Sequence, residues 1–155
     1  MATQLVYAVR HLPYDVHAPN GWAAPLTPAG LAGAEPLADR LVKLVQGATT
    51  VSVFYSGAER TKQTGAPTAV KLGVKFQQAP WLANSSKTVE ALTELREWPK
   101  SGAVILFSHA PFIDGLLTLA GVDVSLVSLP HGGIFPFTFE TENMVTISYQ
   151  PLPVS

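Results

Sequence analysis

Three short apolar segments constrain the fold of this chain more than any other feature. They span residues 5–9, 50–55 and 103–107, and their length and their β-branched and aromatic residues are typical of buried strands. A helical pattern follows each of them. Alternation of strands and helices predicts parallel strands in one sheet with helices on both faces. We therefore expect an α/β fold, arranged as a three-layer α/β/α sandwich.

The first helix has the clearest signals. Thr27 is a typical N-cap and Pro28 suits the first helical position. Apolar residues then recur at intervals of three and four, which predicts one buried stripe. The stripe consists of Leu31, Ala34, Ala38, Leu41 and Val45. Pro36 is expected to kink this helix or delay its start, and Pro67 to interrupt the second helix, near 60–72.

The remaining elements complete the sheet. Residues 12–24 lack an apolar period and are expected to form a loop. A short strand is expected at 74–77, and a helix at 88–98 that ends before a proline. Segments 133–139 and 144–150 are typical of an antiparallel hairpin. The sheet should thus be mostly parallel, with antiparallel C-terminal strands.

Composition limits the classes of function. The 155 residues fit one domain, 1–155, and 47% of them are hydrophobic. A net charge of -1 provides no general attraction for nucleic acid or an anionic membrane. The chain has no cysteine, which excludes thiolate catalysis, and no membrane-spanning run or signal peptide, so we expect a cytoplasmic protein. The oligomeric state stays open.

Polar residues follow the three predicted parallel strands, at the edge where ligands bind in such sheets. These residues are Arg10, His11, Ser56, Arg60, Ser108 and His109. Arginine forks match phosphate oxygens, and free N–H groups at helix amino termini favour an anion beside them. Two arginines and two histidines at one edge therefore predict a phosphate site.

Each of these residues also has a simpler interpretation when taken alone. A single arginine is more often a surface ion-pair partner, and a single histidine is often structural. His17 and His131 lie in loops rich in proline and glycine, where solvated residues are the more typical case. The chain has no nucleotide P-loop, no dinucleotide fingerprint, no esterase elbow and no metal-binding histidine spacing.

Four segments, in order, resemble motifs of the histidine phosphatase superfamily, also called phosphoglycerate mutase-like. Segment 9–11 resembles its Arg-His-Gly signature after the first strand. Segment 25–30 resembles Pro-Leu-Thr-x-x-Gly, 55–64 resembles Ser-x-x-x-Arg-x-x-Gln-Thr, and 108–111 resembles Gly/Ser-His-x-Pro. The short length, without a long insertion before His109, is most similar to the SixA-type phosphohistidine phosphatases of bacteria.

The resemblance implies a phosphoglycerate mutase-like fold and a phosphatase. It implies that His11 is the nucleophile and that Arg10, Arg60 and a protonated His109 bind the phosphate. The phosphoryl group would pass to His11 and then to water, with no metal or other cofactor. The expected substrate is a phosphorylated protein, as in phosphohistidine, or a small phosphomonoester.

Two departures from the family pattern are visible. Leu12 occupies the position of the signature glycine, so its side chain is expected to narrow the pocket or shift the loop and to reduce or abolish activity. Trp81 follows Pro80 where small members carry glutamate, which leaves the proton donor unassigned.

Candidate donors are Asp15, Glu59 and Glu90, although a solvated carboxylate is the more typical interpretation of each. Two alternative functions stay open. One is a non-catalytic phosphate- or phosphoprotein-binding regulatory module with a degenerate site. The other is a mutase-like phosphotransferase, which the short chain and the missing glutamate disfavour.

Overall fold

The computed structural model describes residues 3–83, 102–140 and 146–152. Its centre is a six-stranded sheet with the order β3-β2-β4-β1-β5-β6. The strands are β1 (Thr3–Arg10), β2 (Val51–Tyr55), β3 (Phe76–Gln78), β4 (Ala103–Ser108), β5 (Ile134–Glu140) and β6 (Thr146–Tyr149). Strands β1 to β4 are parallel to one another, whereas β5 pairs antiparallel with both β1 and β6. The mostly parallel sheet with antiparallel C-terminal strands is confirmed.

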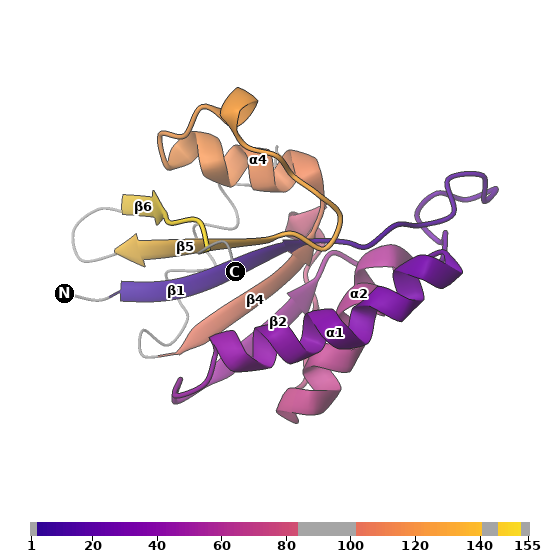
Figure 1. Cartoon of the computed structure of the whole chain (residues 1–155), viewed down its shortest axis with the longest axis horizontal. Coiled ribbons are helices and arrows are strands. Elements are labelled where there is room, and N and C mark those ends of the chain that lie inside the picture. The colour runs from indigo at the N-terminus through magenta and orange to yellow at the C-terminus, as the bar shows by residue number, and fades with distance from the viewer. Residues whose placement is uncertain (1–2, 84–101, 141–145, 153–155) are drawn as a thin grey trace.

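Helices cover both faces of the sheet, as expected for three layers. They are α1 (Pro28–Leu44), α2 (Glu59–Leu72) and α4 (Ala110–Leu119), with short 3₁₀ helices η1 (Pro80–Leu82) and η3 (Val124–Leu126). Figure 1 shows α4 over one face, and α1 and α2 side by side against the other. The same view shows the carboxyl ends of β1, β2 and β4 pointing to one side of the molecule.

The core is divided by the sheet because successive strand residues point to opposite faces. In β1, Val6 and Ala8 pack in the cluster on the α4 side, whereas Tyr7 and Val9 pack in the cluster on the α1 and α2 side. Every residue of β4 is buried. The strands that carry the site residues are therefore the most enclosed part of the fold.

Helix α1 forms where the sequence predicts it, with one error in its stripe. The Thr27 hydroxyl accepts a hydrogen bond from the Gly30 N–H, which confirms the N-cap. Leu31 is 48% exposed, whereas Leu37 is buried and takes its place. The helix also continues through Pro36, which lies on the exposed side, where water can satisfy the carbonyl that loses its partner.

The other predicted elements in the described ranges are found within two residues of their expected bounds, including β3, which lies at 76–78 instead of 74–77. Helix α2 is continuous through Pro67, so the interruption expected there is wrong. The helix predicted at 88–98 and the hairpin turn at 141–143 lie outside the described residues.

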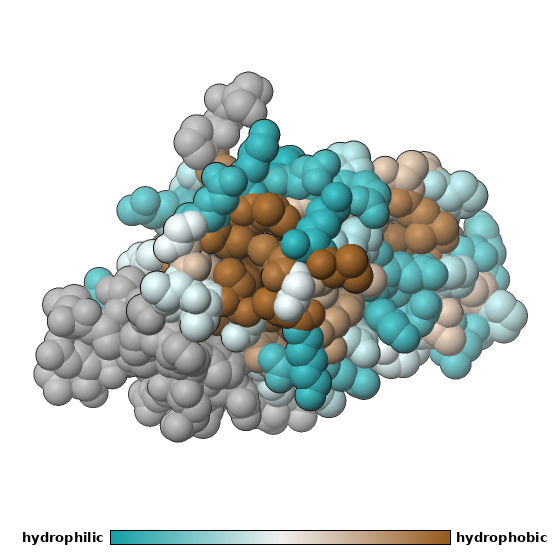
Figure 2. Space-filling view, turned by 90° about the horizontal axis from the view of Figure 1, so that it is seen from below, coloured by the Kyte–Doolittle hydropathy of each residue, from teal (hydrophilic) through white to brown (hydrophobic). Residues whose placement is uncertain are grey.

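The face that carries α1 and α2 has apolar side chains at its surface. Figure 2 views this face and shows hydrophobic residues gathered over its middle, with hydrophilic residues around them. On α2, Val70 is 79% exposed. No helix of the described ranges is both long and apolar enough to span a membrane.

Candidate active site

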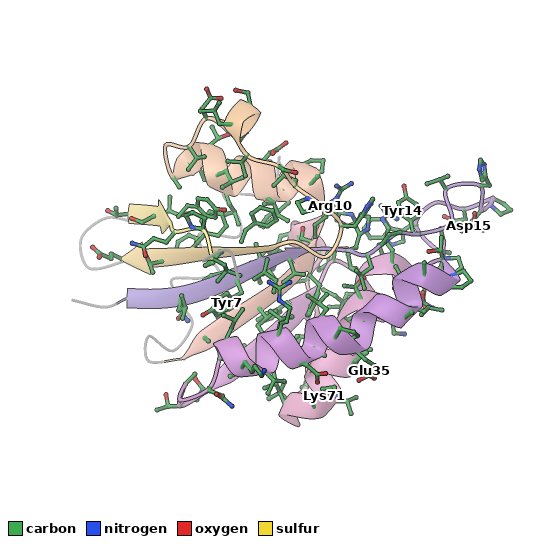
Figure 3. All side chains as sticks on the ribbon, in the orientation of Figure 1. Tyr7, Arg10, Tyr14, Asp15, Glu35 and Lys71 are labelled. Atoms are coloured by element: carbon green, nitrogen blue, oxygen red, sulfur yellow. The ribbon has the colours of Figure 1, made fainter. Side chains whose placement is uncertain are left out.

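The predicted site residues meet at the carboxyl ends of three neighbouring parallel strands. Arg10 pairs with Ser108 in the register of β1 and β4, and Tyr55 of β2 pairs with Phe107. The segments that follow these strands are thus at the same level, which brings together residues about fifty positions apart. Figure 3 shows Arg10 at this end of β1, with Tyr14 beyond it.

His11 is held in one tautomer by the backbone. His11 is 4% exposed, and its backbone N–H donates to the Ser108 carbonyl. Nδ1 lies 2.9 Å from the Leu12 carbonyl oxygen. Because a carbonyl can only accept, Nδ1 carries the proton in this bond and Nε2 keeps a free lone pair. This is the form of imidazole that can attack an electrophile through Nε2.

His109 is held by polar partners on both ring nitrogens. Arg60 Nη2 lies 3.4 Å from Nδ1, and because a guanidinium can only donate, Nδ1 accepts. The ring proton then resides on Nε2, which donates to Ser56 Oγ at 2.8 Å. The Ser56 hydroxyl continues to Thr61 Oγ1 at 3.0 Å, and Thr61 donates to the Ala58 carbonyl. The orientation of His109 is therefore fixed by a buried chain of hydrogen bonds.

Both histidines are neutral in the free protein. Burial lowers the pKa of His11 to about 4, and the charges of Arg60 and Arg10 act in the same direction. Burial lowers the pKa of His109 to about 3, followed by the effect of Arg60. The two rings are 5.3 Å apart between centroids. His109 is thus neutral in the free protein, because a cation there would be desolvated beside two guanidinium groups, and its expected protonation in the phosphate-bound state stays a prediction.

Arg60 is fixed on three sides. Its Nη1 donates to the Gly21 carbonyl at 2.8 Å, and its Cζ lies 4.6 Å from the Tyr14 ring centre and 5.9 Å from that of Trp22. Burial lowers its pKa, although a guanidinium stays charged at neutral pH. These contacts with Tyr14 and Trp22 hold the guanidinium in place through cation–π attraction.

Arg10 approaches the site from β1. Its Nη1 donates to the Leu129 carbonyl. The Nε atoms of Arg10 and Arg60 are both buried, and neither has a hydrogen-bond partner among the described residues. Buried donors are normally satisfied, so two such groups in one cluster indicate a place for an acceptor such as a phosphate oxygen.

Solved structures provide the comparison, since no protein family and no curated protein matches the sequence. A protein from Nakamurella multipartitia, named as a candidate phosphohistidine phosphatase SixA, superposes with a TM-score of 0.74 at 20% identity, over 100% of this chain and 99% of that chain. A mycobacterial glucosyl-3-phosphoglycerate phosphatase with inorganic phosphate superposes with a TM-score of 0.75 at 13% identity, over 97% of each chain.

A SixA candidate from Agrobacterium tumefaciens superposes with a TM-score of 0.69 at 22% identity, over 86% of this chain and 90% of that chain. The chain has the phosphoglycerate mutase-like fold. At these identities the likeness concerns the fold, and the chemistry of the site depends on the residues of this chain.

Leu12 packs in the core of the phosphoglycerate mutase-like fold. Its side chain is 9% exposed and packs in the core on the α1 side. A Cβ on Gly132 would lie 2.8 Å from Leu12 Cδ2, and one on Gly33 would lie 3.4 Å from it. No described residue other than glycine has a positive φ, so Leu12 needs no special backbone. Leu12 thus belongs to the core on the α1 side, and its expected effect on the pocket, the loop and the activity stays a prediction.

Replacing Leu12 by alanine should destabilise the protein and should not raise turnover. Removing a buried leucine side chain costs about 2 to 5 kcal/mol, because the transfer free energy is lost and a cavity remains. The free energy of unfolding from urea titration measures this cost. Leu31→Ala, at an exposed position of α1, is the matched control and should cost less than about 1 kcal/mol. An unchanged stability together with faster turnover would show that Leu12 obstructs the site.

Residues of the segments that resemble family motifs hold the loop after β1 in place through hydrogen bonds and close packing. Thr64 Oγ1 accepts from the Leu12 N–H at 3.0 Å, and Gln63 Oε1 accepts from the Leu26 N–H at 2.7 Å. Gly30 lies so close to the Pro13 carbonyl that a Cβ would be 2.3 Å from its oxygen. These contacts join α2 and α1 to the segment that carries His11.

Two of the proton donors suggested by the sequence lie in the described residues, and neither has a hydrogen bond or ion pair with His11 or His109. The Asp15 carboxylate is exposed and accepts from the His17 N–H within its own loop, and Figure 3 shows it beyond Tyr14. Glu59 begins α2, and its backbone N–H donates to the Trp22 carbonyl. The third, Glu90, lies outside the described residues. In the described ranges no cluster of three histidine, aspartate or glutamate residues is arranged for a metal ion.

Three residues at the site were missed from the sequence. Tyr14 is edge-on to His11, with ring centroids 5.3 Å apart, and Trp22 stacks on His109 at 6.0 Å. His131 is exposed, as its loop position indicates, but its ring also lies 5.6 Å from the His11 ring, which the sequence did not predict. Pairing of Val9 with Ile134 brings this loop to the site, and the sequence pattern had indicated only the pairing of the two C-terminal strands.

Proposed function

We propose that this protein is a phosphatase that transfers a phosphoryl group from phosphohistidine or a small phosphomonoester to His11 and then to water. The observation that carries the proposal is the joint presence of a neutral imidazole with a free Nε2 and two arginines with unpartnered buried Nε atoms. The first group is a nucleophile, and the arginines supply the positive charge that phosphoryl transfer requires.

The chemistry follows from these groups. Phosphate oxygens would accept hydrogen bonds from Arg10 and Arg60, which places phosphorus beside His11 Nε2. The first N–H groups of α4, which begins directly after His109, favour the same negative charge. The dianion raises the pKa of His109, and once Arg60 Nη2 turns from His109 Nδ1 to a phosphate oxygen, Nδ1 can gain a proton and donate to phosphate. In this scheme the arginines neutralise the charge, and no metal or other cofactor is needed.

The fold supports the reaction class but not a particular substrate. The solved structures with the same fold include one named as a glucosyl-3-phosphoglycerate phosphatase and two named as SixA candidates. The alternative of a non-catalytic binding module depended on Leu12, whose side chain packs in the core on the α1 side. A phosphohistidine substrate is favoured because an imidazole leaves readily with little help from an acid.

The pH dependence of turnover tests the proposal. With p-nitrophenyl phosphate, kcat/KM should stay constant near pH 6.5, after correction for the second ionisation of the substrate. It should fall only as the pH approaches 4, because His11 must be neutral to attack and burial lowers its pKa to about 4. Absence of turnover on both this substrate and a phosphohistidine peptide would leave only a binding module. A fall in the corrected kcat/KM as the pH drops through 6.5 would contradict a buried, neutral nucleophile.

A further inference from the structure

With a phosphomonoester substrate, the reaction needs a group that exchanges protons with the leaving oxygen and with water, and the two central histidines are poorly suited to this role. His11 is the nucleophile, and its Nδ1 is engaged with the Leu12 carbonyl. Both ring nitrogens of His109 have partners, in Arg60 and Ser56. The described carboxylates Asp15 and Glu59 make no contact with either ring.

His131 combines the features that such a group requires. Its ring is almost as close to His11 as that of His109, at 5.6 Å against 5.3 Å. A group bonded to His11 Nε2 is therefore near His131, within reach directly or through one water. The residue is exposed, so it can exchange protons with solvent, and no described residue hydrogen-bonds to its ring nitrogens.

The backbone holds His131 in place beside β1. The Gly132 N–H donates to the Arg10 carbonyl at 2.9 Å, and the Arg10 N–H donates to the Gly133 carbonyl at 3.1 Å. The Arg10 guanidinium itself donates to the Leu129 carbonyl. The loop that carries His131 is thus fixed from both sides to the residue that would bind phosphate, which keeps the imidazole at a constant distance from the reacting group.

We propose that His131 is a catalytic residue that gives a proton to the leaving oxygen and later takes one from water; this rests on the proposed function. In the first step His11 Nε2 bonds to phosphorus, the bond from phosphorus to the leaving oxygen breaks, and that oxygen takes its electron pair and a proton from His131. In the second step the neutral His131 ring removes a proton from a water molecule while the oxygen of that water bonds to phosphorus. The P–N bond breaks, and its electron pair returns to Nε2.

The position of the His131 ring and the charge of Arg10 both affect its protonation. Burial lowers the pKa of His131, and the positive charge of Arg10 lowers it further. A phosphate dianion held by Arg10 opposes that effect, so the imidazole gains a proton when substrate binds and loses it once the leaving group departs. The same ring can thus serve as acid and then as base.

The test compares leaving groups of different quality in full-length protein carrying His131→Ala. With glycerol 2-phosphate, whose alkoxide needs a proton to leave, the rate of His11 phosphorylation should fall about 10²- to 10⁴-fold. With p-nitrophenyl phosphate, whose phenolate leaves without help, it should fall less than about 10-fold. Added imidazole should restore a part of the lost rate, which a loss of structure would not allow.

His131→Gln keeps the polarity and approximate size of the ring and should show the same dependence on the leaving group. His17→Ala, at an exposed loop position, is the matched histidine control and should leave both rates unchanged. Equal losses on the two substrates, without rescue by imidazole, would overturn the role of His131 even if His11 carries the phosphoryl group. Turnover by His11→Ala would overturn the proposed function itself, so the two failures are distinguishable.

Discussion

Replacing His11 by alanine should reduce turnover by more than roughly 10⁴-fold, because the variant lacks the nucleophile and has no second group in position to replace it. His109 cannot substitute, since both of its ring nitrogens are engaged, with Ser56 and Arg60. Single-turnover measurement with an aryl phosphate gives this rate.

Vanadate affinity should be measured in the same variant. Arg10 and Arg60 remain, so His11→Ala should still bind an oxyanion, whereas a misfolded protein would not. His17→Ala lacks a histidine in the exposed loop and should turn over like the native protein. Retention of full turnover by His11→Ala would remove His11 from the mechanism while leaving the fold unaffected.

Replacing Arg60 by alanine should weaken binding of phosphate or vanadate by about 10- to 150-fold, the equivalent of about 1.5 to 3 kcal/mol for a charged hydrogen bond. Turnover should fall further, because the guanidinium also stabilises the negative charge on the equatorial oxygens in the transition state. Isothermal titration with vanadate and steady-state kinetics measure the two effects.

Two further variants define the origin of this loss. Arg40→Ala removes an exposed arginine of α1 and should leave affinity unchanged. Arg60→Lys should recover only part of it, because a lysine cannot form the two parallel bonds of a guanidinium or stack between Tyr14 and Trp22. Unchanged vanadate affinity in Arg60→Ala would mean that Arg60 serves only to hold the Gly21 loop.

The architecture could be predicted from the sequence because its signals are local. Apolar segments of strand length, the Thr27 N-cap and the alternation of strands with helices determine layers and strand direction. The errors concern residues whose environment depends on distant segments. Leu31 has the right spacing for the buried stripe, but Leu37 is the one that faces the sheet side of α1. Pro36 and Pro67 are accommodated in continuous helices, which spacing alone does not indicate.

The site was predictable only in part. Arg10, His11, Arg60 and His109 follow strands that are parallel neighbours, so topology brings them together. His131 arrives through the antiparallel pairing of β5 with β1, a contact over more than a hundred residues that no local pattern shows. The packing of Leu12 could not be predicted because it depends on the space left by Gly33 and Gly132, which is a property of the packed structure.

The most direct test of the account is to trap the phosphorylated protein. Rapid quench during turnover of a ³²P-labelled substrate should yield label that is stable in base and labile in acid, as expected for phosphohistidine. Peptide mapping should place this label on the peptide that contains His11, and His11→Ala should give none. Label that survives acid and is lost in base, or label that persists in His11→Ala, would contradict the claim that His11 carries the phosphoryl group.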